Sequence, residues 1–274
     1  MRAAANFRLY RHGLAALLFM IACCRALPAQ IQHKLGDLSL LDTSNLSANA
    51  MNGTTPSKPD TRKPDQPVQK LIVVGFLGGH VSATNCVHRE AQLIQSLQQS
   101  YPQAVHAVAF ANRNGDLALK SILQLLGGNN HPTEAQKQSA RIVIYGHSWG
   151  ASETVTLANR LNKLGIPVLL TVQVDSVRKR DQNDQEIPPN VQEAVNFYQS
   201  EGLLRGRQRI VAMDPERTKI LGNHESSYRQ NPISCTGFPW YARTFMRRHI
   251  QIENDPAVWD QIEAMILSRI NPSA

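Results

Sequence analysis

The chain has 274 residues, of which 42% are hydrophobic and 18% are charged, and its formal net charge is +8. This is enough apolar sequence for one domain with a buried core. Four arginines and no acidic residue fall in residues 1–29, so the rest of the chain carries only about +4. No basic patch is interleaved with aromatic residues, and the composition therefore does not indicate a nucleic-acid partner.

Residues 1–29 have the layout of a secretory signal peptide. Arginines precede an apolar run at Leu14–Cys24, and small residues follow it. The run is shorter than the roughly 20 residues that a membrane-spanning helix needs, so no integral membrane span is expected. Cleavage after Ala29 would give a secreted or periplasmic protein. The alternative is a lipid-anchored lipoprotein, with Cys23 in "MIAC" as the lipid acceptor.

Residues 30–67 are rich in Ser, Asn, Thr, Pro and Lys and predict a disordered segment or linker. From residue 68 to 274 the texture is that of one catalytic domain. Apolar runs without strict alternation, typical of buried parallel strands, alternate with helix-like segments. The predicted strands are 70–79, 104–112, 141–148, 167–177 and 208–214. The predicted helices are 88–99, 116–126, 152–164, 191–198 and one that begins at Asp255-Pro256 and runs to about 270, while 222–248 has no clear period and predicts a loop.

This alternation predicts an α/β fold with three α/β/α layers and a mostly parallel, doubly wound sheet. One motif stands out at the end of the third strand. In "RIVIYGHSWGASETV", Gly146 and Gly150 flank Ser148 in a Gly-x-Ser-x-Gly pattern. Small flanking residues are what a tight strand-to-helix turn requires if it is to expose a serine at a helix N-terminus.

On this motif and the upstream "VVGFLGG", residues 70–270 resemble the α/β-hydrolase superfamily in a compact, lipase- or esterase-like form. The superfamily's first antiparallel strands are not obvious here. The resemblance implies a Ser–acid–His triad in that chain order, with Ser148 as the nucleophile.

Two carboxylates compete for the acid position. Asp175 ends the strand after the serine strand, in "VLLTVQVD", and Asp214 ends "RIVAMD". The superfamily mostly uses the second place, but "VDSV" resembles the ending of its lipase-like minority, and we take Asp175 as the acid. For the base, His249 lies just before the last helix, where the superfamily holds its histidine; His224 is the second choice. His147 is expected to pack inward, and His80 could line the pocket mouth.

The resemblance also implies two oxyanion-hole amides, those of Phe76, after Gly75 in the first loop, and of Trp149. Cys86 and Cys235 are the cysteines outside the leader, and in an exported chain they suggest one disulfide near the catalytic face. No Cys/His cluster has metal-ligand spacing, and "GFLGGH" lacks the ending of a phosphate-binding loop, so neither a metal nor a cofactor is expected.

The sequence thus predicts an exported serine hydrolase that cleaves a small-molecule carboxylic ester or thioester through an acyl-enzyme on Ser148. The alternatives are an amidase, a catalytically silent α/β-hydrolase-fold binding protein, and a surface lipoprotein.

Overall fold

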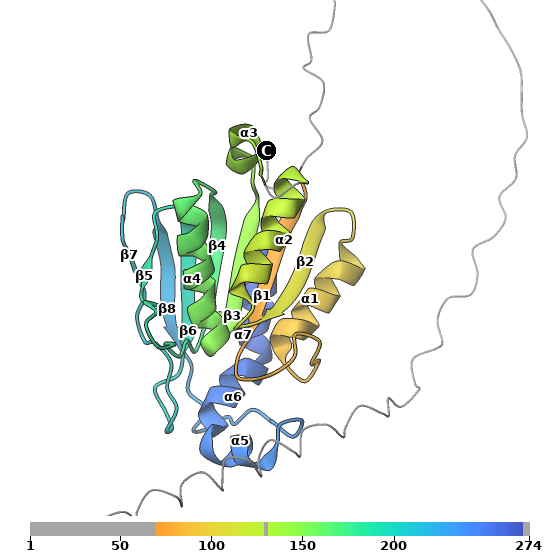
Figure 1. Ribbon diagram of the computed structural model, residues 1–274. Coiled ribbons are helices and arrows are strands. Elements are labelled where there is room, and N and C mark those ends of the chain that lie inside the picture. The colour runs from red at the N-terminus through yellow and green to blue at the C-terminus, as the bar shows by residue number, and fades with distance from the viewer. Residues whose placement is uncertain (1–68, 129–130, 271–274) are drawn as a thin grey trace, which may run out of the picture. The chain divides into compact units, whose positions relative to one another are not determined.

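The computed structural model describes residues 69–128 and 131–270. The predicted signal peptide and the whole of the predicted linker lie outside the described residues. The described part is built around a six-stranded sheet whose neighbouring strands are all parallel (Figure 1). In spatial order its strands are β2 (Val105–Ala111), β1 (Leu71–Leu77), β3 (Ile142–His147), β4 (Val168–Val174), β6 (Val191–Tyr198) and β8 (Lys219–Glu225).

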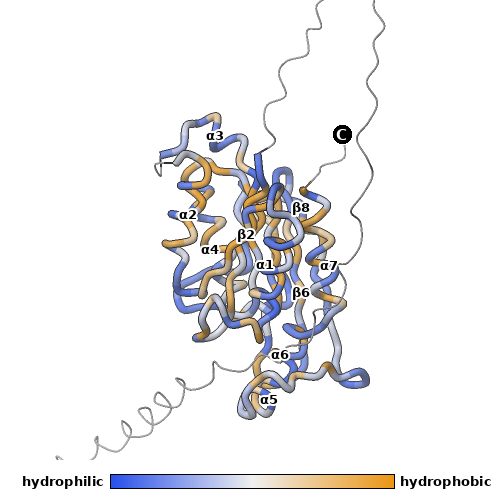
Figure 2. The backbone as a smooth tube through the Cα atoms, turned by 90° about the vertical axis from the view of Figure 1, so that its right-hand side faces the viewer, coloured by the Kyte–Doolittle hydropathy of each residue, from blue (hydrophilic) through white to orange (hydrophobic). Residues whose placement is uncertain are grey.

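Helices cover both faces of this sheet, as the apolar runs of its inner strands require, since a strand buried on both sides has no polar face. The helices are α1 (Arg89–Ser100), α2 (Gly115–Gly127), α3 (Glu134–Gln138), α4 (Trp149–Lys163), α5 (Trp240–Phe245), α6 (Arg247–Asn254) and α7 (Pro256–Leu267). Side chains of α2 and α4 share one apolar core, and those of α1 and α7 share the other. Figure 2 shows α2 and α4 on one side of the molecule and α7 on the other. The predicted three-layer α/β/α architecture is confirmed.

The chain reverses direction across the sheet between β1 and β3. It runs from β1 outward to β2, and then crosses back so that β3 pairs with the other side of β1. Ligands of open α/β sheets bind at the carboxyl ends of the strands beside such a switch point. The loops after β1 and β3 therefore frame the expected site.

The carboxyl-terminal third departs from the predictions. Residues 191–198, predicted as a helix, form the buried strand β6, and residues 219–225 form β8, which extends into the predicted loop 222–248. The predicted strand 208–214 contributes only β7 (Val211–Ala212), which pairs with β5 (Glu186–Ile187) outside the main sheet. The sequence VQEAVNFY places Val, Ala, Val and Tyr at i, i+3, i+4 and i+7, which fits a helix, but burial between β4 and β8 selects the strand.

The start of α7 follows the prediction. Asp255 is its N-cap, where a side-chain oxygen accepts a hydrogen bond from Ala257 N, and Pro256 occupies the first helical turn. None of the helices in the described ranges is long and apolar enough to cross a membrane.

Candidate active site

Ser148 lies at the sharp turn between β3 and α4. Its backbone has φ 58° and ψ −122°, a conformation that a non-glycine residue rarely adopts. The two glycines of the motif make this turn possible. A Cβ on Gly150 would overlap the carbonyl of Phe76, and one on Gly146 would meet the backbone of Gly150 at 2.5 Å. The sequence therefore folds into a strained turn that only small flanking residues permit.

The turn is fixed to the next strand of the sheet. Ser148 N donates to Val174 O (3.0 Å), and Val177 N donates to Ser148 O (3.2 Å), so the serine and the residue after β4 are neighbours. Trp149 opens α4, and amides in a first helical turn have no partner within the helix. Together with the helix dipole, the Trp149 amide provides a positive end beside Ser148 that favours an anion.

Asp175 follows β4 directly and is fully buried. Its φ of 43° is also in the left-handed region. Four hydrogen bonds reach its carboxylate: from Gln199 N (3.2 Å), Gln199 Nε2 (2.9 Å), Gly206 N (2.9 Å) and the ring of His249. A carboxylate has about four lone-pair sites, so this set of donors saturates it and fixes its orientation.

His249 comes from α6, 74 residues further along the chain than Asp175. Its Nδ1 lies 2.6 Å from Asp175 Oδ2, while its Nε2 is buried and has no hydrogen-bond partner among the described residues. The imidazole ring lies against that of His147, with 4.4 Å between ring centroids. Because His147 directly precedes Ser148, the histidine, the aspartate and the serine occupy one end of the sheet.

The competing candidates lie elsewhere. Asp214 Oδ1 accepts from Glu216 N in the turn after β7, away from the carboxyl ends of the main sheet. His224 is exposed on β8, where it stacks on Phe197. His80 is exposed as well, with its ring edge-on to Trp149 at 5.1 Å. His147 packs inward, as predicted, with 3% of its surface exposed.

The predicted oxyanion role of Phe76 does not fit the structure. Leu71 N bonds to Ala104 O on the β2 side and Ile72 N to Arg141 O on the β3 side, so amides alternate along β1. Phe76, four residues after Ile72, therefore directs its amide at β3, within the sheet. The residue of this loop beside Ser148 is Gly78, where a Cβ would meet Ser148 Cβ at 2.9 Å. β1 ends at Leu77, within the predicted strand 70–79, so the amide nearest the serine turn comes from the loop after Leu77 and not from Phe76.

Behind the serine turn lies a cluster of buried ionisable groups that the sequence did not predict: His88, Glu90, His147 and Glu253. Burial, and next the charge of Glu253, raise the pKa of Glu90 well above its usual value. Burial raises the pKa of Glu253 to about 8. Burial, followed by the charge of His249, lowers the pKa of His147 well below its usual value. The four residues come from three separate elements and a loop, so no local sequence signal joins them.

The two cysteines are free, and the expected disulfide is not formed. Cys86 is exposed and Cys235 is half-buried against the carbonyls of Ile233 and Ile250. Burial raises the pKa of the Cys235 thiol to about 11.

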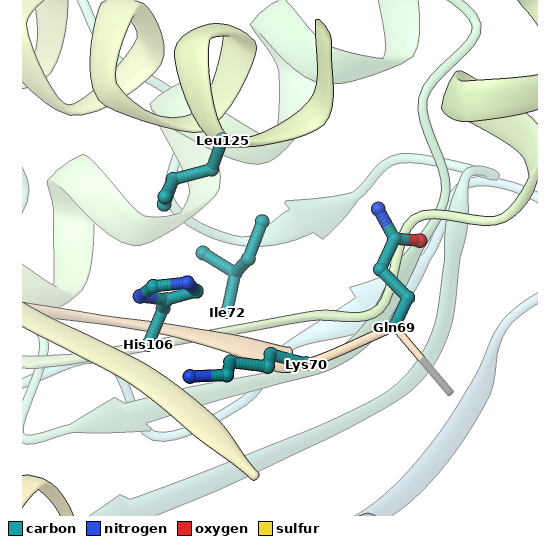
Figure 3. Close-up of a pocket in the computed structure, with 5 residues that line it drawn as sticks. All are labelled: Gln69, Lys70, Ile72, His106 and Leu125. Atoms are coloured by element: carbon teal, nitrogen blue, oxygen red, sulfur yellow. The ribbon is translucent and has the colours of Figure 1, made fainter. Parts of the chain in front are cut away.

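The triad candidates are themselves enclosed. Ser148 is 7% exposed and His249 is 1% exposed. A shallow pocket of about 120 Å³ lies instead at the amino-terminal ends of β1 and β2 (Figure 3). Its lining is Gln69, Lys70, Ile72, His106 and Leu125. This is the opposite end of the sheet from Ser148, so the pocket does not belong to the candidate active site.

The parallel sheet, with a serine at the turn after β3 and a histidine beyond the last strand, defines a fold of the α/β-hydrolase type. No family model and no curated protein matches the chain. Among solved structures, it is similar to the type II thioesterase BorB from the borrelidin biosynthetic cluster (11% identity, 76% of this chain and 96% of that chain, TM-score 0.39). It is also similar to the RedJ thioesterase of Streptomyces coelicolor (10%, 76% and 96%, 0.38) and to an esterase of Pyrobaculum calidifontis (14%, 75% and 77%, 0.37).

Proposed function

We propose that this protein is a serine hydrolase that cleaves a carboxylic ester or thioester. The observation that carries the proposal is the buried pair of Asp175 and His249, with His249 Nε2 left unpartnered at the end of the sheet that presents Ser148. A serine hydroxyl is a poor nucleophile unless a base takes its proton, and the base needs a third group to orient it. The Asp175–His249 pair supplies such a base and its orienting group at the end of the sheet that presents Ser148.

In the proposed reaction, Ser148 Oγ attacks the substrate carbonyl carbon while its proton passes to His249 Nε2. Asp175 holds the ring so that Nδ1 carries a proton and Nε2 is the basic nitrogen. The tetrahedral oxyanion is stabilised by the amide of Trp149 and by the loop at Gly78–Gly79. His249 then protonates the leaving alcohol or thiol, leaving an acyl group on Ser148. Water, deprotonated by the same nitrogen, releases the acid and restores the hydroxyl.

We also propose that the protein is exported by the leader in residues 1–29, on the strength of the sequence pattern alone. Amino-terminal sequencing of the protein recovered outside the cytoplasm should begin at Gln30. A lipid-modified Cys23 at the amino terminus would instead support the lipoprotein alternative.

The activity is tested by labelling with a fluorophosphonate, which reacts with activated serines, and by a panel of p-nitrophenyl esters of graded acyl length. The wild-type protein should label at one site and turn over esters, and Ser148→Ala should neither label nor retain more than about 10⁻⁴ of kcat. Thr156→Ala, on the same helix, serves as a control that should label normally. A wild-type protein that neither labels nor hydrolyses any ester would favour the silent binding protein.

A further inference from the structure

The buried cluster behind the serine turn brings together four side chains that commonly bind metal ions. His88 Nδ1 lies 2.5 Å from Glu253 Oε1, and His147 Nδ1 lies 3.3 Å from Glu253 Oε2 and 4.0 Å from Glu90 Oε1. One donor atom from each of His88, Glu90 and Glu253 falls within 4.8 Å of the others. His88 is 12% exposed, and the other three side chains are 3% exposed or less. The cluster is therefore shielded from water.

The two carboxylates have no strong counter-charge. Within the described residues, their ion-pair partners are the imidazoles of His88 and His147, with no lysine or arginine among them. A buried anion is strongly unfavourable unless it is paired, protonated or bound to a cation. Either protons on the carboxyls or a bound cation must therefore neutralise this cluster.

Two atoms in the cluster, Glu90 Oε2 and His147 Nδ1, also lack a hydrogen-bond donor among the described residues. Glu90 Oε2 is buried and makes no hydrogen bond, although Glu90 Oε1 accepts one from Gly78 N. His147 Nε2 lies 3.2 Å from the carbonyl oxygen of His249, which can only accept a hydrogen, so the proton belongs on Nε2. In the neutral ring, the Nδ1 lone pair then faces the oxygens of Glu253 and Glu90. A lone pair directed at carboxylate oxygens is the arrangement of metal ligands around an ion.

We propose that His88, Glu90, His147 and Glu253 bind a divalent transition-metal ion of the zinc type. Two imidazole nitrogens with two carboxylates suit zinc, whereas calcium and magnesium prefer sets made only of oxygen. Donors at about 2.05 Å from a tetrahedral ion are about 3.3 Å apart. His147 Nδ1 and Glu253 Oε2 have this separation, whereas His88 Nδ1 contacts the other oxygen of Glu253 and His147 Nδ1 is 4.0 Å from Glu90 Oε1, so the side chains would rotate to place one oxygen of each carboxylate on the ion. His88 and Glu253 would separate by roughly 0.8 Å to admit the ion, a small side-chain rotation.

Such an ion would act as a structural clamp on the site. It would join the start of α1, the serine turn and α6, on which Glu253 lies one turn after His249. Through Glu90 it would also hold Gly78, the loop residue beside Ser148. The proposal does not depend on the hydrolase chemistry, and its test does not measure activity.

The test uses the full, untagged chain, stripped with a chelator and titrated with ZnCl₂ by calorimetry, alongside Glu90→Gln and Glu253→Gln. Glu216→Gln, on an exposed turn, is the matched control. We expect the wild type and the control to bind one equivalent more than either cluster variant. Saturating Zn²⁺, at about 100 times Kd, should raise Tm by about 5–10 °C only in the proteins that keep the site. Co²⁺ in place of Zn²⁺ should give visible absorption bands that are lost in both variants.

Equal binding and equal Tm shifts in all four proteins would overturn the proposal. A second result would also overturn it: the wild type neither binds Zn²⁺ nor gains Tm from it, and the glutamine variants are as stable as the metal-free wild type. Glutamine mimics a protonated carboxyl, so this result would mean that protons neutralise the cluster. If either glutamine variant fails to fold, His88→Gln replaces it, since His88 is the most exposed of the four ligands.

Discussion

Asp175 makes the most exacting contacts of any side chain in the candidate site. Its two oxygens accept from two backbone amides, one side-chain amide and one imidazole, all in a fully buried position. An amide in its place would present hydrogens to at least one of these donors. The identity of this one residue therefore controls the orientation and tautomer of His249.

Asp175→Asn should lower kcat by about 10⁴-fold, because the imidazole would be held in the wrong tautomer. Asp214→Asn is the matched control, since Asp214 only closes a turn by accepting from Glu216 N. It should leave kcat within about twofold of the wild type. Steady-state kinetics on a p-nitrophenyl ester decides between the two carboxylates. If Asp175→Asn kept the wild-type kcat and Asp214→Asn had no measurable turnover, the acid of the triad would be misassigned.

Gly150→Ala should destabilise the domain by about 3 kcal/mol, because the alanine methyl group would overlap the backbone carbonyl of Phe76, which is held in β1 and cannot move away. Gly128→Ala is the control: its φ of 71° is strained for alanine, but a Cβ there meets nothing within 4 Å. It should cost only about 1–2 kcal/mol. Urea unfolding measures both, and equal losses would mean that the close approach at Gly150 is not what requires a glycine.

At the scale of elements, α5 and α6 form a small unit beyond one end of the sheet (Figure 1). Phe238, Ala242 and Ile250 make an apolar cluster of their own, which holds α5 to the helix that carries His249. Trp240 and Phe245 on α5 remain exposed, at 67% and 57%. Each of these exposed aromatic side chains offers an apolar surface, on the helix packed against α6, to which an acyl chain could bind.

Trp240→Ala and Phe245→Ala should each raise KM for long-chain p-nitrophenyl esters by about 3–10-fold, with little effect on kcat or on short-chain esters, because they remove apolar contact area and no reacting group. Leu117→Ala removes a similarly exposed apolar side chain from α2 and should change neither parameter. Equal effects on short and long chains would argue against an acyl-binding role for α5.

The elements also show which sequence signals were sufficient. Runs such as LIVVGFL have buried residues at every position and could be identified as inner strands without any structure. VQEAVNFY has gaps in its apolar pattern that a helix fits equally well, and only its two neighbouring strands decide the matter. The oxyanion loop shows the same limit: Phe76 pairs with both β2 and β3 and Leu77 with β2, so both lie in the sheet, and the loop beside Ser148 begins at Gly78.

At the scale of the whole molecule, the members of both main apolar cores within the described residues lie between Leu71 and Ile270. A chain beginning at Val68 should therefore unfold cooperatively, with a Tm within about 2 °C of the full-length protein. That chain contains Cys86 and Cys235 alone, and both should react with a thiol reagent. Cys86, being exposed, should react first, and the rate at Cys235 should rise as pH increases towards its pKa of about 11. A count of zero free thiols before reduction would show that Cys86 and Cys235 do form a disulfide.

The sequence by itself determined the order of the main strands and helices through β4 and the serine turn, and it singled out Asp175 and His249, which the structure brings into hydrogen-bond contact. These features depend on local patterns, on small residues at a tight turn and on position at strand ends. Only the tertiary structure decided the strand at 191–198, the loop residue beside the serine and the buried cluster of His88, Glu90, His147 and Glu253. Each of these depends on which distant segments are brought into contact. The energetic cost of burying a carboxylate, and the interaction between charges on different elements, do not change the spacing of residues along the chain and so cannot be read from it.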